Sequence, residues 1–531
     1  MKPSSLTQSM SWLHTWGGLI FGWLLFAIFL TGTLAVFDKE IDVWMQPEAP
    51  VSHVDQAQAA EHAISYLQRH HGAESAWDIS LPTARSPVLS VSTGERRRNA
   101  PRQYLDPNTG EPIDIRETAG GRFFFLFHFT LHMPRNIGIW LVGLAAVGML
   151  VALFSSLIIH KKFFKEFFTF RPNKGQRSWL DAHNATGVLV LPFHLMITYT
   201  GLVIFSLIYM PAAVDALFDG DREAAFGRGQ PAKTEQQAAQ GARNGRSQNE
   251  GRGEGSGELV ALTPLQPLLL QAEQALGEVR SVSISHPGRS DARIEMRPVL
   301  GNRIELSKGL SMTFAGVSGE VLKMPEQSRW AQLTQRVLSG LHFAQFGGYP
   351  MRWLYFICGM ASCAMIATGL VLFTVKRRRR PEAEGPIAAQ LYHLAERLNI
   401  SVIAGLSIAC AAYLWGNRLL PAELSQRGAW EVRVFFACWA LSLLHACCRE
   451  RTQAWREQLV CAAALCVCMP LLSLATMTRP WAEPIRAYLE LSTVACGALF
   501  AFAAWRIGQK KPAPAPRPQS RNVSQELLNA D

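Results

Sequence analysis

The chain has 531 residues, of which 49% are hydrophobic and only 18% are charged, and its formal net charge is +11. The hydrophobic residues form runs of about 20 residues, the length that an α-helix needs to cross a bilayer, so a soluble protein with a single core is excluded. The Lys and Arg residues cluster beside these runs, which argues against nucleic acid as a partner.

Eight apolar runs predict membrane-spanning helices. They lie near residues 12–37, 137–159, 185–209, 351–375, 399–419, 429–447, 457–477 and 484–505. The first run lacks a clear small-residue cleavage site and is longer than a typical signal-peptide core. We therefore interpret it as a retained anchor in the lipid bilayer.

The distribution of Lys and Arg over the short loops predicts the orientation. Twenty of them lie in the stretches 160–178, 376–397, 448–456 and 506–521, and five lie in the opposite loops 418–433 and 478–486. The KRRRR run at 376–380 is most simply a stop-transfer and orientation signal. This bias places both termini in the cytoplasm and two long polar segments, about 38–136 and 210–350, outside.

The two outer segments have similar patterns. Each begins with a helical pattern, at 54–72 and 263–279, and continues into short alternating stretches that are typical of strands. YLDPNTGEPI (104–113) contains a predicted hairpin turn, and MTFAGVSGEVL (312–322) occupies the corresponding place in the second segment. We expect two small α+β modules, and a disordered linker at 219–257, where Gly, Gln, Ala and charged residues dominate.

The spans also repeat. Residues 11–37 match residues 180–205 at a constant offset that aligns His14 with His183 and Thr31-Gly32 with Thr200-Gly201. LHMPRNIG (131–138) similarly matches LHFAQFGG (341–348), which aligns His132 with His342. The first four spans are therefore predicted to be two copies of one span–domain–span unit related by a pseudo-twofold axis, and the last four spans lie outside this repeat.

Seven histidines lie at span ends or inside spans, where ionisable side chains are costly and usually functional. His14, His160 and His183 are predicted at the cytoplasmic face, His128, His132 and His342 at the outer face, and His194 inside span 3. A pseudo-twofold axis would bring His14 to His183 and His132 to His342. Two facing imidazoles supply the axial ligands of a b-type haem, so the sequence predicts two haems b, bound noncovalently because no C-x-x-C-H motif occurs.

Several alternatives for these histidines remain open. His194 follows His183 by almost three helical turns and would point the same way, so that one helix could supply a ligand to each of two haems. His128 precedes His132 by four residues and would share its helix face, so it could replace a member of the outer pair, and His160 could do the same inside. Interfacial histidines that reach water or cap helix ends are the simpler alternative, and a zinc site at His128 and His132 lacks an acidic partner.

Glycines near the paired histidines would let a macrocycle approach the backbone; they are Gly17, Gly18, Gly138, Gly187, Gly347 and Gly348. The sequence contains no G-x-G-x-x-G in a strand–helix context and no G-x-x-x-x-G-K-[ST]. No cytoplasmic segment is long enough for a flavin or nicotinamide domain. If the protein moves electrons, the donor is therefore external: a flavin reductase, a soluble reduced flavin or a membrane quinol.

The WLHTWGGLIFGW opening, the DAHNATGVLVLPFH start of span 3, the LHM and LHF motifs and YLDPNTGEPI together resemble the PepSY-associated transmembrane family of bacterial inner-membrane proteins, over about residues 1–380. The resemblance implies two periplasmic PepSY domains on a four-span core. It also implies a haem-bearing reductase that reduces the Fe(III) of a ferric siderophore, so that the chelator releases Fe(II). It assigns the haem iron to His14 and His183 inside and to His132 and His342 outside. The extra spans at 399–505 depart from the simplest members.

The expected fold is an α-helical polytopic membrane protein of about eight spans, with a pseudo-twofold four-span core and two periplasmic α+β PepSY-like domains. The predicted segments are span 1 (1–37), PepSY-like domain 1 (38–136), spans 2 and 3 (137–209), the linker (210–258), PepSY-like domain 2 (259–350), span 4 (351–380), a cytoplasmic linker (381–398), four additional spans (399–505) and a cytoplasmic tail (506–531).

The expected function is that of a haem-containing inner-membrane oxidoreductase, which passes electrons from the cytoplasmic side or the quinol pool to a periplasmic ferric siderophore. The ferric chelate would bind between the outer domains and the membrane, beside Arg122, Arg135, Phe123 to Phe125, Phe343 and Phe346, although packing explains the Phe residues equally well. The alternative is a non-catalytic PepSY membrane module that binds or restrains a periplasmic partner.

Overall fold

The computed structural model describes residues 5–50, 55–94, 102–159, 171–172, 174–218, 257–325, 328, 330–377, 385–482 and 484–509. Several predicted features lie partly or wholly outside these residues: His160, most of the linker at 219–257, positions 378–380 of the KRRRR run, residues 381–384 of the cytoplasmic linker, and the cytoplasmic tail from residue 510. The fold below is that of the described residues.

Most of the described chain is helical. Six segments are long and apolar enough to cross a membrane: α1 (Leu6–Ala35), α5 (Arg135–Ile159), α14 (Gly348–Arg377), Pro386–Leu419, α17 (Arg427–Cys448) and α20 (Pro484–Gly508). The segment Pro386–Leu419 consists of α15 (Pro386–Ile400), the π-helical turn η3 (Ser401–Gly405) and α16 (Leu406–Leu419). Two bent pairs, α6 (Gln176–Leu189) with α7 (Leu191–Ile204) and α18 (Arg451–Val467) with α19 (Met469–Thr476), bring the number to eight if each pair is one span. These segments coincide with the predicted runs, and the prediction of a polytopic membrane protein is confirmed.

The third span is not straight. Its two helices meet at Val190 with a bend of 65°. Pro192, near the start of α7, has no N–H to donate and its ring does not fit inside a continuous helix. The prediction that His183 and His194 point the same way along one straight helix is therefore wrong.

Short helices lie next to the spans. α2 (Asp38–Met45) follows α1, α4 (Arg122–Thr130) precedes α5, and α13 (Trp330–Phe343) precedes α14. α8 (Ser206–Tyr209) and α9 (Pro211–Phe218) follow the bent span. α4 and α13 occupy equivalent places before the second and fourth spans, as the repeat predicts.

The two predicted α+β modules form one sheet. The strands are β1 (Ala76–Ser80), β2 (Leu89–Thr93), β3 (Gln103–Leu105), β4 (Pro112–Ile113), β5 (Val279–Ser285), β6 (Arg293–Pro298), β7 (Met312–Ala315) and β8 (Val321–Lys323), and their order is β4-β3-β2-β1-β5-β6-β7-β8. All neighbours are antiparallel, and β1 pairs with β5 so that Ile79 lies opposite Val282. α3 (Gln56–His71) and α12 (Leu265–Leu276) pack on this sheet and share one apolar core with it. The predicted modules are thus present, but they are joined rather than separate.

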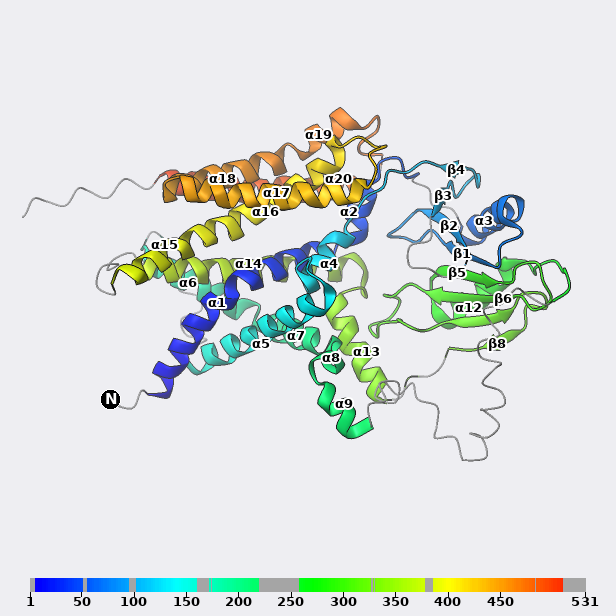
Figure 1. The fold of residues 1–531 in the computed structure, drawn as a ribbon, viewed down its shortest axis with the longest axis horizontal. Helices are drawn as coiled ribbons and strands as arrows, with labels where there is room; N and C mark the ends of the chain where they lie inside the picture. Colours follow the sequence, from blue (N-terminus) through cyan, green and yellow to red (C-terminus); the bar gives the residue numbers. More distant parts are fainter. Residues whose placement is uncertain are drawn as a thin grey trace, which may run out of the picture.

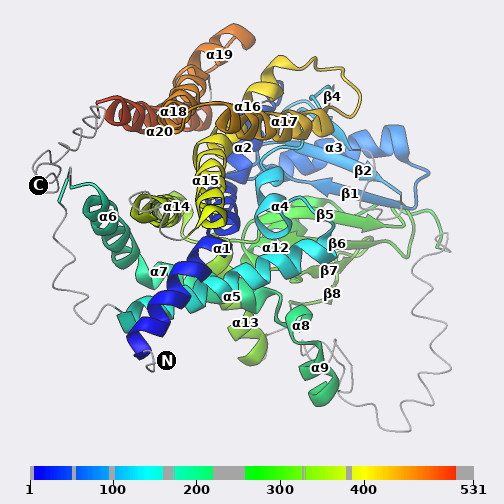
Figure 2. The ribbon, with the colours of Figure 1, turned by 60° about the vertical axis from the view of Figure 1, so that its left-hand side comes forward.

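The sheet lies at one end of the helical bundle, and α1 begins at the opposite end (Figure 1). In both views the C-terminal helices α16 to α20 lie on one side of α1 and α4, and α5 and α7 lie on the other side (Figure 2). The bundle core joins these layers through apolar side chains of α1, α4, α14, α16 and α17. The C-terminal helices are therefore packed into the same bundle as the first four spans.

Candidate functional site

Two predicted histidines meet near the end of the bundle that is remote from the sheet. His14 lies on α1 and His183 lies on α6, and their ring centroids are 6.1 Å apart. Nδ1 of His14 is 2.9 Å from the carbonyl oxygen of Ala152, and Nδ1 of His183 is 2.8 Å from that of Met365. We call His14 and His183 the distal pair, and their predicted juxtaposition is present in the structure.

A second pair lies nearer the sheet, on α4 and α13. The ring centroids of His128 and His342 are 6.0 Å apart. Nδ1 of His128 is 2.8 Å from the carbonyl oxygen of Ile28, and Nδ1 of His342 is 3.0 Å from that of Ile197. We call His128 and His342 the sheet-side pair.

The carbonyl contacts determine the tautomer of all four rings. A carbonyl oxygen can only accept a hydrogen bond, so Nδ1 of each ring must carry the proton and donate it. Nε2 is then the nitrogen with the lone pair, which is the usual arrangement when the second ring nitrogen binds a metal. The four imidazoles are thus oriented and in the correct tautomer for ligation through Nε2.

The contacts repeat with the sequence. Ile28 and Ile197 are separated by the same number of residues as His14 and His183. The equivalent glycines of the repeat, Gly32 and Gly201, lie against the two sheet-side rings: a Cβ atom on Gly32 would be 2.5 Å from Nδ1 of His128, and one on Gly201 would be 2.9 Å from Cε1 of His342. Glycine is therefore required where the backbones of α1 and α7 approach these imidazoles.

The spacing of both pairs fits one metal ion between two imidazoles. With metal–nitrogen bonds of about 2.0–2.1 Å and a ring centroid about 1.1 Å beyond each nitrogen, two axial imidazoles have centroids about 6.2 Å apart. The observed separations are 6.1 Å and 6.0 Å. All four rings are only partly buried, and a Cβ atom on Gly17 or Gly18, one turn from His14, would meet nothing within 4 Å. The residues present therefore fit a bis-histidine haem.

Within the described ranges, no group of three or more His, Cys, Asp or Glu side chains is placed to hold a metal ion. A haem needs only two protein ligands, because the macrocycle supplies the other four. Two imidazoles therefore match the number of protein ligands that a haem needs.

The structure pairs His342 with His128 and not with His132, which the repeat alignment had selected. α4 ends at Thr130, and Leu131 and His132 both have positive φ angles, of 52° and 58°. His132 is therefore not on the helix face of His128, as was predicted, but in the exposed turn before α5. Its ring contacts Phe123 and Phe436, with centroids 5.8 Å and 5.4 Å away.

His194 lies on α7 and is fully buried. Neither of its ring nitrogens has a hydrogen-bond partner in the described part of the chain. Its ring centroid lies 6.4 Å from that of Phe29, in an edge-to-face arrangement. It is outside both pairs. The bend of span 3 accounts for this, because the direction of α7 differs from that of α6.

The residues that were predicted to line a substrate cleft divide into two groups. Phe123 and Phe124 are almost fully buried in the bundle core, so packing explains them. Arg122 and Arg135 are exposed, and the guanidinium carbon of Arg135 lies 5.9 Å from the ring centre of Phe129. Phe125, Phe343 and Phe346 are half-buried, so they and the two arginines remain at least partly accessible.

Sequence reasoning missed the contacts that orient the imidazoles. The carbonyl groups of Ala152, Met365, Ile28 and Ile197 belong to residues with no chemical signature, so no motif marks them. The Thr-Gly pairs of the repeat could have indicated where a helix backbone approaches an imidazole ring. Gly369, which follows Thr368, has the same role beside His183, because a Cβ atom there would be 2.9 Å from Cε1 of that ring.

Comparison with known proteins places the chain in a family. The model of the PepSY-associated TM region matches residues 11–376, which include both histidine pairs but not the helices from α15 onward. An uncharacterised protein of Pseudomonas aeruginosa, PA4219, is 25% identical over 386 residues, which cover 69% of this chain and 89% of that relative. The chain therefore belongs to the family of the PepSY-associated TM region.

Proposed function

We propose that this protein is a haem-b-containing reductase of the bacterial inner membrane, which passes electrons from the cytoplasmic side or the quinol pool to a periplasmic ferric siderophore and releases Fe(II). Both termini would lie in the cytoplasm and the eight-stranded sheet in the periplasm, as the distribution of Lys and Arg predicts. The observation that carries the proposal is the presence of two imidazole pairs with one tautomer and one spacing.

The histidines would act as axial ligands. His14 and His183 would hold one haem, and His128 and His342 would hold the other. Haem iron supplies one-electron redox chemistry. The protein fixes each ring through its Nδ1–H hydrogen bond to a backbone carbonyl. Glycines on neighbouring helices further restrict the rings of His128, His183 and His342.

The position of the two pairs supports electron transfer across the bilayer. The distal pair belongs to the end of α1 and to α6, and the sheet-side pair belongs to α4 and α13, which lie close to the sheet (Figure 1). A ferric chelate is too polar to enter an apolar bundle, so it would receive its electron on the sheet side. The exposed Arg122 and Arg135 are suited to an anionic chelate there.

The test is to reduce the purified protein anaerobically with dithionite, remove the excess, and add a ferric hydroxamate or catecholate siderophore. We expect the reduced absorption bands to disappear while ferrozine traps a matching amount of Fe(II). If no ferric chelate reoxidises the protein faster than buffer does, while another periplasmic oxidant does, the siderophore assignment is wrong. A folded protein that contains no haem would instead favour the non-catalytic module that binds or restrains a periplasmic partner.

A further inference from the structure

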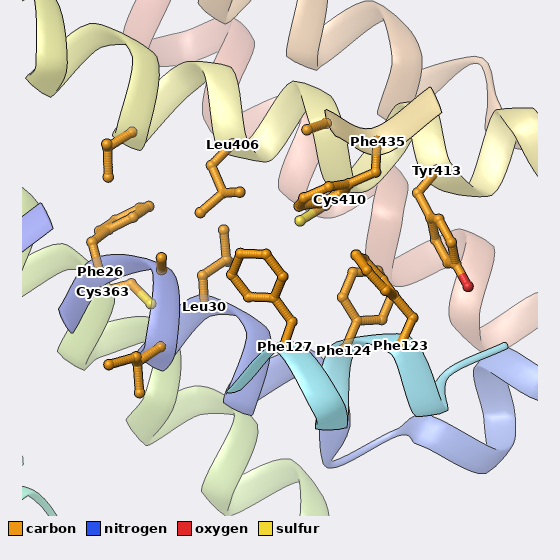
Figure 3. Packing of buried hydrophobic residues seen from close by; sticks show 14 of the residues in the cluster. Phe26, Leu30, Phe123, Phe124, Phe127, Cys363, Leu406, Cys410, Tyr413 and Phe435 are labelled. Carbon is orange, nitrogen blue, oxygen red and sulfur yellow. The ribbon is translucent and has the colours of Figure 1, made fainter. Parts of the chain in front are cut away.

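The helices after the family region are in direct contact with the helix that carries His128. One face of α4 presents Phe123, Phe124 and Phe127 to α16 and α17, as Figure 3 shows. Phe123 stacks on Tyr413 with ring centroids 4.8 Å apart, and Phe127 lies 5.5 Å from Phe435. Without the C-terminal helices this aromatic face of α4 would lose these ring partners.

The neighbouring face of α4 meets the first four spans. His128 donates its Nδ1–H to Ile28 of α1 and faces His342. Phe125 packs near Phe343, which is the residue after His342, with ring centroids 5.9 Å apart. α4 is thus held between the C-terminal helices on one face and the histidine site on the other, and a shift of the helix would change the separation of the sheet-side pair.

The start of α4 is fixed by hydrogen bonds from the same C-terminal helices. The carboxylate of Glu431 on α17 accepts hydrogen bonds from Oγ1 of Thr118, at 2.7 Å, and from the backbone N–H of Ala119, at 3.0 Å. The hydroxyl of Tyr413 donates to the carbonyl oxygen of Gly120, at 2.8 Å. These three consecutive residues lead directly into α4, so its first turn has little freedom to move.

Glu431 is itself held in place. Its side chain is fully buried, and its second oxygen accepts hydrogen bonds from Arg427, at 2.5 Å, and from Asn417, at 2.7 Å. Taking a charged pair out of water is costly, and removing one partner would leave the other charge buried and unpaired. Gly428 lets α17 approach closely, because a Cβ atom there would be 2.9 Å from the backbone nitrogen of Ala119.

We propose that the C-terminal helices position the sheet-side haem, with Glu431 and Tyr413 as positioning residues that act through α4 on His128. The inference rests on the proposed function, because it presupposes a haem between His128 and His342. It assigns a role to helices that lie outside the family region. The rings of the distal pair are held instead by carbonyl groups of α5 and α14.

The test compares two substitutions on α16, each of which removes one hydrogen bond. Tyr413→Phe removes the bond to Gly120, and Trp415→Phe removes a bond to the carbonyl of Leu465, which stays within the C-terminal helices. Both are made in full-length His183→Ala and His342→Ala chains, so that each haem is observed alone by electron paramagnetic resonance and redox titration. We expect Tyr413→Phe to shift the g values and the midpoint potential of the sheet-side haem only, and Trp415→Phe to shift neither haem.

Glu431→Gln gives a stronger version of the test. It places amide protons opposite the Arg427 and Asn417 donors, and we expect partial loss of the sheet-side haem with the distal haem retained. If this variant does not fold, Tyr413→Phe still tests whether the C-terminal helices position the sheet-side haem. Unchanged spectra of the sheet-side haem with Tyr413→Phe, or equal shifts of both haems, would overturn the inference. A wild-type protein without haem would instead overturn the proposed function.

Discussion

Replacing Gly32 with Ala should selectively disrupt the sheet-side pair. The new Cβ atom would lie 2.5 Å from Nδ1 and 2.7 Å from Cε1 of His128, whereas ordinary van der Waals contact begins at 3.4 Å. The imidazole would have to move by roughly 1 Å, because overlaps of this size are not absorbed in a packed interior. This movement would stretch the 2.8 Å hydrogen bond from Nδ1 to Ile28 and displace Nε2 from its position opposite His342.

The size of the effect follows from two contributions. Overpacking typically costs about 1–3 kcal/mol, and a lost hydrogen bond costs about 0.5–1.5 kcal/mol. A total of about 1.5–4.5 kcal/mol would weaken haem binding at this site by about 10- to 1,600-fold, since each 1.4 kcal/mol is a factor of ten. Gly201→Ala should have a smaller effect, because its Cβ atom would reach only Cε1 of His342, at 2.9 Å.

The assay is the haem content per chain, measured as the pyridine haemochrome. Gly32→Ala should lower it from two towards one, and the remaining haem should be that of the distal pair. Gly22→Ala is the matched control on the same helix, because its Cβ atom would be 2.7 Å from Cδ2 of Leu370, a flexible side chain that can move aside. Two haems with unchanged spectra in Gly32→Ala would refute the assignment of His128, and loss of haem in both variants would show only a general defect of α1.

Three further predictions concern other parts of the structure. His128→Ala and His342→Ala should each remove the same haem, whereas His132→Ala should leave both, because only His128 faces His342; loss of that haem with His132→Ala would contradict the pairing. Arg85→Ala should destabilise the protein by about 3–5 kcal/mol, because the guanidinium makes two hydrogen bonds to the buried carboxylate of Glu40; an unchanged melting temperature in detergent would argue against it. Ile79→Ala should cost about 2–5 kcal/mol and unfold both halves of the sheet in one transition, since β1 pairs with β5; two separate transitions would disprove the shared core.

The spans could be predicted because their lengths are set by the bilayer. Each run of about 20 apolar residues corresponds to a helix or a bent pair of helices in the structure. The helices α3 and α12 and the hairpin at Asn108 were also predictable, because their signals are local: an amphipathic period and a turn sequence. The pairing of β1 with β5 joins strands about 200 residues apart, and no local pattern specifies which edges of two small sheets meet.

The distal pair could be predicted from the repeat, but the sheet-side pair could not be predicted completely. His128 and His132 are four residues apart, the spacing of one helix face, so both are predicted on one helix. Pro134 was the overlooked signal, because residues before a proline avoid the helical conformation. Once α4 ends at Thr130, His132 leaves the helix and only His128 can face α13. Pro192 similarly marked the bend that separates His194 from His183.

The central claim is that two imidazole pairs, His14 with His183 and His128 with His342, each hold one haem b. The most direct measurement is the visible spectrum and pyridine haemochrome of the full-length protein purified from membranes, with protein concentration determined independently. Two equivalents of haem b per chain, low-spin and with sharp Soret and α bands on reduction with dithionite, are the predicted result. A correctly folded protein that is colourless, or whose haem persists when all four of these histidines are replaced, would contradict it.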